Sequence, residues 1–371
     1  MDKQIKLKVS HPSHTTQIHF GIDFALSKHI PRMLDETDRK VALITDTQIE
    51  KRYGPVLEKL DLKVFSFPEG EAQKNRKTKE MLEDHLLSHQ FGRDSLLIGL
   101  GGGVVTDLTG FLASNYCRGV PVIFVPTTLL GMVDAAIGGK TGINTPFGKN
   151  MIGSFYPPEE VIIDGSFLST LPKHEWTNGV VELLKAALIA SPSLFESMNS
   201  QIDLWNAQDL PFIMDQIFEG IQIKKEVVER DPFEKRGERR ILNFGHTIGH
   251  AIEQFEEYKI PHGQAVAIGI LAACYISEKM GLLGSNTRLN IEKAFRLFHI
   301  PLEITKEISF DALVKALSID KKSQGSIPRM VLIEGIGRVA AFNGEYCTQV
   351  DFSLIDETLI WIHKNFLKSH G

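Results

Sequence analysis

The chain has 371 residues, a length that predicts two domains. Its apolar fraction of 43% and charged fraction of 23% are ordinary for a globular protein, and its net charge of −5 gives no reason to expect a nucleic-acid partner. No apolar run approaches the length of a membrane span, no signal peptide is recognisable, and three widely spaced cysteines exclude a disulfide framework, so we expect a cytoplasmic protein.

The first half of the chain alternates between predicted strands and helices. Two short alternating runs within the first 35 residues indicate edge strands, and an amphipathic helix is expected at 78–89. Buried strands are expected at 41–47, 95–100, 120–128 and 161–165. This alternation is typical of an α/β domain with a Rossmann-like parallel sheet.

A glycine-rich turn, Gly99–Gly103, joins one of these strands to a helix that carries Asp107. Glycines at such a turn let backbone N–H groups approach a pyrophosphate at the helix N-terminus. Val104 departs from the usual G-x-G-x-x-G pattern, and a turn packed for its own sake remains the alternative. Asp46, at another strand end, could hold ribose hydroxyls, and Thr127-Thr128 follows a further strand.

The pattern becomes mainly helical beyond residue 171. Helices are expected through 175–280 and then at 285–298, 310–317 and 354–367, with two short strands within 329–342. We therefore predict an α/β domain over 1–171 and a mainly α-helical domain over 172–371.

The helical half contains a candidate metal site. His246 and His250 stand four residues apart, so both would project from one helix face, and His262 follows at a turn. Glu182 precedes Lys185 by three residues on another predicted helix. Two histidines and a carboxylate suit zinc or a similar ion with one position left open. The alternative is a solvated helix face, because the Glu of H-E-x-x-H is missing.

Basic residues accompany these groups. Lys140 and Lys149 lie among glycines in the stretch 134–153, and Lys224, Arg239 and the Asp320–Lys322 run follow. Such cations favour a pocket for a small anion, although the charged run 235–240 is also typical of solvated surface. A metal ion combined with a nicotinamide would imply oxidation of an alcohol.

Several motifs in order resemble the 3-dehydroquinate synthase family of sugar phosphate cyclases. They extend from Thr45 to Lys322 and include FPEGEAQK, GLGGGVVTDLTGF, VPTTLL, GKNMIGSFYPP, VELLK, LNFGHTIGHAIE and HGQAVAIG. The resemblance implies a shikimate-pathway lyase that uses NAD and Zn²⁺ or Co²⁺, works as a homodimer, and has its active site in the cleft between the two domains. The implied reaction converts 3-deoxy-D-arabino-heptulosonate 7-phosphate into 3-dehydroquinate and phosphate through a transient oxidation by NAD⁺.

The resemblance also assigns roles to residues. Glu182, His246 and His262 would be the metal ligands, and His250 would relay a proton instead of binding the ion. Substrate and catalytic positions would be Asp134, Lys140, Asn150, Lys185, Lys224, Arg239, Asn243 and Lys321 or Lys322, with Arg118 reaching the partner subunit's site. NAD-contacting positions would be Asp46, Glu71, Lys74, Gly102, Gly103, Val104, Asp107, Thr127, Thr128, Lys140, Lys149, Phe167 and Thr170.

Two departures and three rivals accompany this interpretation. The segment before Arg239 is one residue longer than the family spacing, which weakens the Lys224 assignment, and Ala135-Ala136 replaces the more usual serines. Another sugar phosphate cyclase would act on a substrate without a carboxylate, whereas Arg239 and Asn243 favour an acid. A polyol or glycerol-phosphate dehydrogenase would release NADH. A protein with a structural zinc would need a closed ligand set.

Overall fold

The computed structural model describes residues 3–9, 14–319 and 328–368. The chain forms two compact units: unit 1 comprises Met1–Pro172 and Leu210–Ile221, and unit 2 comprises Lys173–Asp209 and Gln222–Gly371. The first turns of helix α8 (Leu210–Arg230) thus belong with unit 1, where Phe218 packs edge-on against Phe20 at 5.3 Å. The predicted boundary at residue 171 divides the chain only once, so it does not account for the first turns of α8 lying in unit 1.

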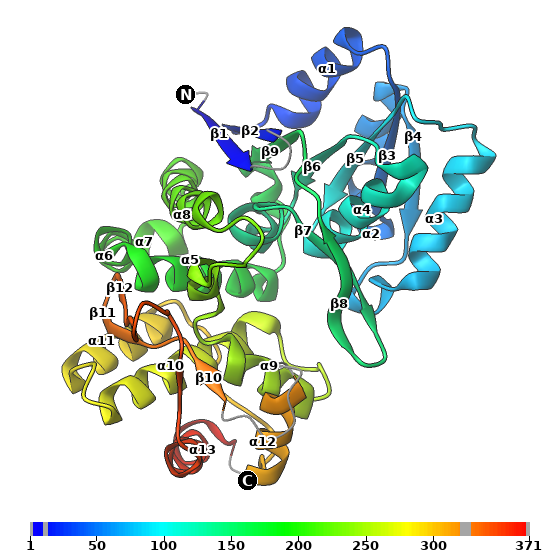
Figure 1. The fold of residues 1–371 in the computed structure, drawn as a ribbon. Helices are drawn as coiled ribbons and strands as arrows, with labels where there is room; N and C mark the ends of the chain where they lie inside the picture. Colours follow the sequence, from blue (N-terminus) through cyan, green and yellow to red (C-terminus); the bar gives the residue numbers. More distant parts are fainter. Residues whose placement is uncertain (1–2, 10–13, 320–327, 369–371) are drawn as a thin grey trace. The chain divides into compact units, whose positions relative to one another are not determined.

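Unit 1 is built on a seven-stranded sheet (Figure 1). The strands lie in the order β1 (Lys3–Val9), β2 (His14–Gly21), β9 (Glu160–Asp164), β6 (Val122–Pro126), β5 (Ser95–Gly101), β3 (Lys40–Asp46), β4 (Lys63–Phe67). All neighbours are parallel except β1 and β2, which confirms the predicted parallel sheet. The prediction that both N-terminal strands are edge strands was wrong, because β2 also pairs with β9.

The strand order creates a switch point beside β3. The chain leaves β3 toward β4 on one side and then returns to β5 on the other. In doubly wound sheets of this order, ligands bind where the connections diverge, at the carboxyl ends of the two strands. Here those ends carry Asp46 and the Gly101–Gly103 turn. The Asp46 carboxylate already accepts the N–H groups of Gln48 and Ile49, both at 2.9 Å, and so caps helix α2 (Thr47–Leu57).

Four α-helices and a hairpin complete the main part of unit 1. Besides α2 they are α1 (Ile30–Glu36), α3 (Arg76–Ser88), α4 (Gly103–Asn115) and the antiparallel strands β7 (Lys140–Thr145) and β8 (Gly148–Phe155). The hairpin was missed in the sequence, where its glycines were interpreted only as space for an anion. Those glycines serve close backbone packing as well, since a Cβ on Gly153 would lie 2.0 Å from the Thr141 carbonyl oxygen.

Unit 2 is mainly helical, as the sequence predicts (Figure 1). Its helices are α5 (Lys173–Ala190), α6 (Pro192–Ser200), α7 (Ile202–Asn206), the remainder of α8, α9 (His246–Phe255), α10 (His262–Lys279), α11 (Ser285–Leu297), α12 (Phe310–Ile319) and α13 (Phe352–Phe366). Short strands occur at β10 (Arg329–Met330), β11 (Ile333–Gly335), β12 (Arg338–Val339) and β13 (Thr348–Gln349). Within the described ranges, no helix has the length and hydropathy needed to cross a membrane.

Helices α9 and α10 approach each other unusually closely because glycines face the contact. Gly245 has a φ of +78°, and a Cβ there would lie 2.7 Å from the backbone nitrogen of Ile270. A Cβ on Gly269 would lie 2.1 Å from the Gly245 carbonyl oxygen. A Cβ is excluded at both positions, and the positive φ of Gly245 fixes where α9 begins.

Candidate functional site

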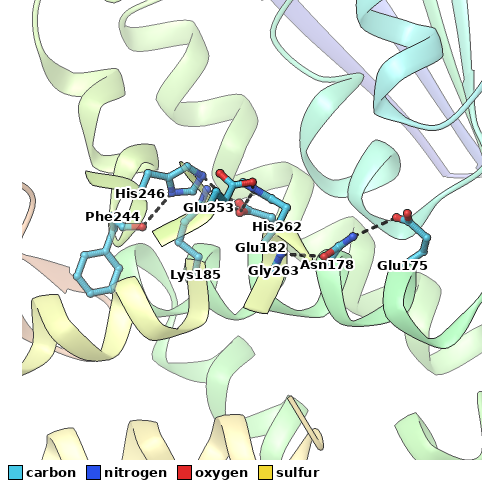
Figure 2. Close-up of polar contacts among 9 residues, drawn as sticks. All are labelled: Glu175, Asn178, Glu182, Lys185, Phe244, His246, Glu253, His262 and Gly263. Carbon is cyan, nitrogen blue, oxygen red and sulfur yellow. Dashed lines mark hydrogen bonds and ion pairs between the residues drawn. The ribbon is translucent and has the colours of Figure 1, made fainter. Parts of the chain in front are cut away.

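Three side chains from three helices of unit 2 converge on one point (Figure 2). Glu182 comes from α5, whereas His246 and His262 are the first residues of α9 and α10. The Nε2 atom of each histidine lies 3.5 Å from Oε1 of Glu182, and the three ligand atoms all lie within 4.8 Å of one another. The structure therefore brings together the three residues that the sequence predicts as metal ligands.

Each histidine is oriented by a contact at its other ring nitrogen. Nδ1 of His246 lies 3.2 Å from the carbonyl oxygen of Phe244, and Nδ1 of His262 lies 3.3 Å from Oε1 of Glu253 (Figure 2). Such partners hold each ring in orientation and would leave Nε2 as the ligand atom once a metal ion displaces its proton. Both Nε2 atoms consequently face the Glu182 carboxylate.

The start of α10 is anchored to α5 by Asn178. Its side-chain oxygen accepts the N–H of Gly263 at 2.8 Å, while its amide nitrogen donates to Glu175 at 3.2 Å (Figure 2). This places His262 opposite Glu182. Sequence reasoning missed both Asn178 and Glu253; the only local signal for Glu253 is its helical spacing from the histidines of α9.

The charges at this point are strongly coupled. Burial by itself raises the pKa of Glu182, but the Lys185 ammonium and the two histidines hold it well below its usual value. Burial, reinforced by Lys185, lowers the pKa of His246 to about 3, which leaves a neutral imidazole. Burial also disfavours charge on His262, yet the nearby carboxylates of Glu182 and Glu253 raise its pKa to about 10. The carboxylates of Glu182 and Glu253 thus stabilise positive charge at His262.

The donor set fits a divalent ion of the zinc type. Glu182 is only 2% exposed, and neither of its carboxylate oxygens has a hydrogen-bond partner of good geometry, although its ion pair with Lys185 remains. Two imidazole nitrogens and one carboxylate oxygen form an open, three-residue set of the kind found in catalytic zinc sites. His250 is not part of this set, because the ligand atoms that lie within 4.8 Å of one another belong to Glu182, His246 and His262.

A cavity of about 410 Å³ adjoins these residues within unit 2. It is lined by Glu234, Arg240, Asn243, His246, Thr247, His250, Arg329, Val331 and Cys347. Of the predicted site residues, His246, His250 and Asn243 therefore share one cavity.

Arg239 lies apart from this lining. It is 2% exposed, and its guanidinium donates to the carbonyl oxygen of Pro232 at 2.7 Å. The interpretation of the charged run as solvated surface fails for this residue, although Lys235 and Arg236 beside it are exposed. Lys224 is buried in α8. Whether Arg239 and Lys224 contact substrate stays a prediction.

The predicted nucleotide residues lie along the carboxyl ends of the parallel strands of unit 1. Gly102 precedes α4, and a Cβ there would lie 3.0 Å from Cγ2 of Thr128. The Thr128 hydroxyl accepts the N–H of Gly131 at 3.0 Å, and the N–H of Thr127 donates to Gly101 at 2.9 Å. The glycine turn and the two threonines are thus neighbours, and α4 begins without a side-chain cap. Whether the turn binds a nucleotide stays a prediction.

A second group links the turn after β4 to the β7–β8 hairpin. Glu71 accepts the side-chain amide of Asn144 at 2.7 Å, and Asn144 in turn accepts the N–H of Asn150 at 3.0 Å. Asn150 has a φ of +55°, a conformation that this hydrogen bond helps to hold. Asn144 was not singled out in the sequence, because its role depends on a pairing between distant segments.

The remaining predicted residues are distributed over unit 1. Asp134 lies in the turn Gly131–Ala135, Lys140 on β7, Lys149 on β8, Arg118 in the turn after α4, and Phe167 and Thr170 in the turn Gly165–Thr170. Val104 lies in the first turn of α4. Lys321 and its neighbours Asp320 and Lys322 fall outside the described residues.

Lys74 and Asp107 form a buried ion pair in unit 1. Burial by itself lowers the pKa of Lys74, but Asp107 and Glu71 reverse this, so the ammonium stays charged. Burial raises the pKa of Asp107, and Lys74 offsets part of that effect. The pair fixes the start of α3 relative to α4.

Replacing Lys74 with Met is expected to lower the free energy of unfolding by ~3–5 kcal/mol, because it leaves the Asp107 carboxylate buried without its partner. Urea denaturation followed by circular dichroism measures this. The matched control is the double variant Lys74→Met/Asp107→Asn, which should recover part of the loss. An unchanged denaturation midpoint in the single variant would contradict the buried pair.

Comparison with known proteins indicates the same family for the N-terminal and the C-terminal part of the matched sequence. The 3-dehydroquinate synthase N-terminal family model matches residues 64–178, and the C-terminal model matches residues 179–323. A 3-dehydroquinate synthase from Nitrosospira multiformis is 42% identical over 332 residues, which cover 86% of this chain and 89% of that protein.

Solved structures of related cyclases share the fold. A 2-deoxy-scyllo-inosose synthase complexed with carbaglucose-6-phosphate, NAD⁺ and Co²⁺ superposes with a TM-score of 0.82 at 26% identity, covering 97% of this chain and 99% of that one. A 2-epi-5-epi-valiolone synthase from Streptomyces hygroscopicus, with NAD⁺ and Zn²⁺ bound, gives 0.84 at 25% identity, with 96% and 98% covered. Since the two family models together match most of the sequence and meet within α5, just before Glu182, the chain belongs to the 3-dehydroquinate synthase family.

Proposed function

We propose that the chain is a 3-dehydroquinate synthase, a lyase that converts 3-deoxy-D-arabino-heptulosonate 7-phosphate into 3-dehydroquinate and phosphate. The observation that carries this proposal is the convergence of Glu182, His246 and His262 in a chain of this family. We further propose that the enzyme depends on NAD and on Zn²⁺ or Co²⁺, which are bound to the two related cyclases of known structure.

The proposal assigns each group of residues a task. A divalent ion held by Glu182, His246 and His262 would acidify a substrate hydroxyl, and NAD⁺ would accept a hydride from the same carbon. Helix α4 has no side-chain cap at Gly102, so the N–H groups of its first turn would be available to a pyrophosphate. His250, exposed in the cavity, would carry a proton to or from the substrate.

The transient ketone explains why an elimination needs an oxidant that is not consumed. A carbanion next to a carbonyl is stabilised, whereas one next to an alcohol is not, so phosphate leaves from the oxidised substrate. Once the hydride returns, the product has the oxidation state of the starting material. Two arginines, Arg240 and Arg329, line the same cavity as Asn243, and their charge supports an acid-bearing substrate.

We also propose that the protein forms a homodimer. Arg118 is exposed and lies in a turn where it has a φ of +71° and Cys117 a φ of +49°. This supports the assignment of Arg118 to the partner subunit's site. Light scattering that gives a monomer mass across micromolar concentrations would rule the dimer out.

The decisive experiment follows phosphate and reduced nicotinamide in one cuvette. With the heptulosonate phosphate, Zn²⁺ and NAD⁺ equal to the enzyme concentration, we expect many phosphate ions released for each NAD⁺ and no steady rise in NADH absorbance, because the hydride returns to the same substrate.

The main rivals predict different results in this assay. A polyol or glycerol-phosphate dehydrogenase would form NADH in step with substrate loss and release no phosphate. Another sugar phosphate cyclase would release phosphate only from a substrate without the carboxylate, so the same assay is repeated with a sugar phosphate that lacks the acid group. Turnover of that substrate alone would replace the proposed substrate.

A further inference from the structure

A second cluster of possible metal ligands lies in unit 1 and consists of His19, His29 and Glu160. His19 is in β2, Glu160 begins β9, and His29 ends the helical turn Ala25–His29 before α1. The Nε2 atoms of His19 and His29 lie 3.1 Å and 2.8 Å from the same oxygen, Oε2 of Glu160. All three ligand atoms lie within 4.8 Å of one another.

The surrounding structure holds these side chains in place. β2 and β9 are paired in parallel, and the neighbouring residues Ile18 and Val161 are fully buried. The turn that carries His29 is fixed by Asp164, which is 2% exposed at the end of β9. Its carboxylate accepts the N–H groups of residues 23, 24 and 25, each at 2.8 Å. The three ligands are therefore positioned by the fold and not by a mobile loop.

One ligand atom of the cluster lacks a satisfied hydrogen bond. Nε2 of His19 is buried and makes no hydrogen bond of good geometry, although it lies 3.1 Å from the Glu160 carboxylate. The side chains of His19 and Glu160 are 18% and 23% exposed, whereas that of His29 is 8% exposed. The Glu160 side chain is the most exposed of the three, so a bound ion would meet solvent on that side, where a water molecule could be its remaining ligand.

The spacing of the ligand atoms suits a tetrahedral ion. Bonds of about 2.0–2.1 Å at tetrahedral angles place neighbouring ligand atoms ~3.3 Å apart. The Nε2 atoms of His19 and His29 lie 3.1 Å and 2.8 Å from Oε2 of Glu160, only a few tenths of an ångström less than this ideal spacing. Small side-chain rotations would make up the difference. Imidazole nitrogen combined with a carboxylate favours zinc and similar ions over Mg²⁺ or Ca²⁺, which prefer oxygen ligands.

We propose that His19, His29 and Glu160 bind a second divalent ion of the zinc type, separate from the one assigned to Glu182, His246 and His262. The matched part of the chain begins at residue 64, so neither histidine belongs to the family models. A bound ion would tie β2, β9 and the turn before α1 together and would stabilise unit 1. The proposal does not depend on the catalytic reaction.

Zinc content in a background without the first site tests this proposal. The double variant Glu182→Gln/His246→Gln is dialysed against Zn²⁺ and then against metal-free buffer, and its metal is measured by mass spectrometry. We expect about one zinc ion per chain in this background and none after adding His29→Gln. Glutamine is chosen because its amide can still donate a hydrogen bond to Glu160, so that the fold is kept.

Two further measurements separate binding at this cluster from binding elsewhere. His85→Gln, in the exposed face of α3, is the matched control and should leave the zinc content unchanged. Zn²⁺ should raise the thermal midpoint of the background and of the control, but not of the His29→Gln variant, because only the folded site binds the ion. Zinc absent from the background, or equally retained after His29→Gln, would overturn the proposal.

Discussion

Removing divalent ions with a chelator is expected to abolish phosphate release from the heptulosonate phosphate while leaving the fold of unit 2 intact. The proposed ion is held by Glu182, His246 and His262 and polarises the reacting hydroxyl, a contribution that no side chain of the cavity replaces. Even loss of a residue that merely supports a ligand typically costs 10–100-fold in activity, so we expect the loss of the ion itself to exceed ~100-fold.

The fold should survive because the buried charges keep partners without the ion. Glu182 remains paired with Lys185, so chelation does not leave an isolated carboxylate in the core of unit 2. The close packing of α9 on α10, through Gly245 and Gly269, involves no ligand atom.

Turnover and far-ultraviolet circular dichroism are measured before and after chelation, and again after Zn²⁺ is restored. Recovery of activity on adding Zn²⁺ is the control for irreversible damage. Full activity without metal would refute the assigned ligand set. Global unfolding on chelation would instead favour a structural zinc.

Replacing His250 with Ala is expected to lower kcat by ~10²–10⁴-fold and to leave the metal ion of this site bound. His250 lines the cavity and is exposed there, but it lies outside the three-ligand cluster. Its ring centroid is 5.2 Å from that of His246, close enough to pass a proton to a substrate held beside the ligands. General acid–base help of this kind is what the substitution removes.

Steady-state kinetics and zinc analysis of the purified variant decide the role of His250. His85→Ala, an exposed histidine on α3, is the matched control and should change neither kcat nor metal content. Loss of one bound ion relative to the unsubstituted protein would make His250 a ligand. An unchanged kcat with full metal content would indicate that His250 has no catalytic role and only forms part of a solvated helix face.

Much of the fold could be predicted from local sequence patterns. Alternation of apolar runs predicted the parallel sheet, the helical second half and the late strands, because periods of two and of 3.6 residues are properties of neighbouring residues. The run Gly99–Gly103 predicted the strand-to-helix turn before α4, where glycine avoids the clash that a Cβ would make. The resemblance then selected Glu182, His246 and His262 from several possible ligand sets, and the structure joins them.

What only the tertiary structure decided depends on contacts between distant parts of the chain. Glu253 and Asn178 acquire their roles when α5, α9 and α10 pack together. Arg239 looks like part of a solvated basic run but is buried against Pro232. His29 and Glu160 are 131 residues apart, and no periodicity relates them. The sequence predicted most of the elements, although not the β7–β8 hairpin, and it proposed the residues of the candidate site. Long-range packing decided which polar groups meet, because burial and pairing are fixed only when separate elements share a core.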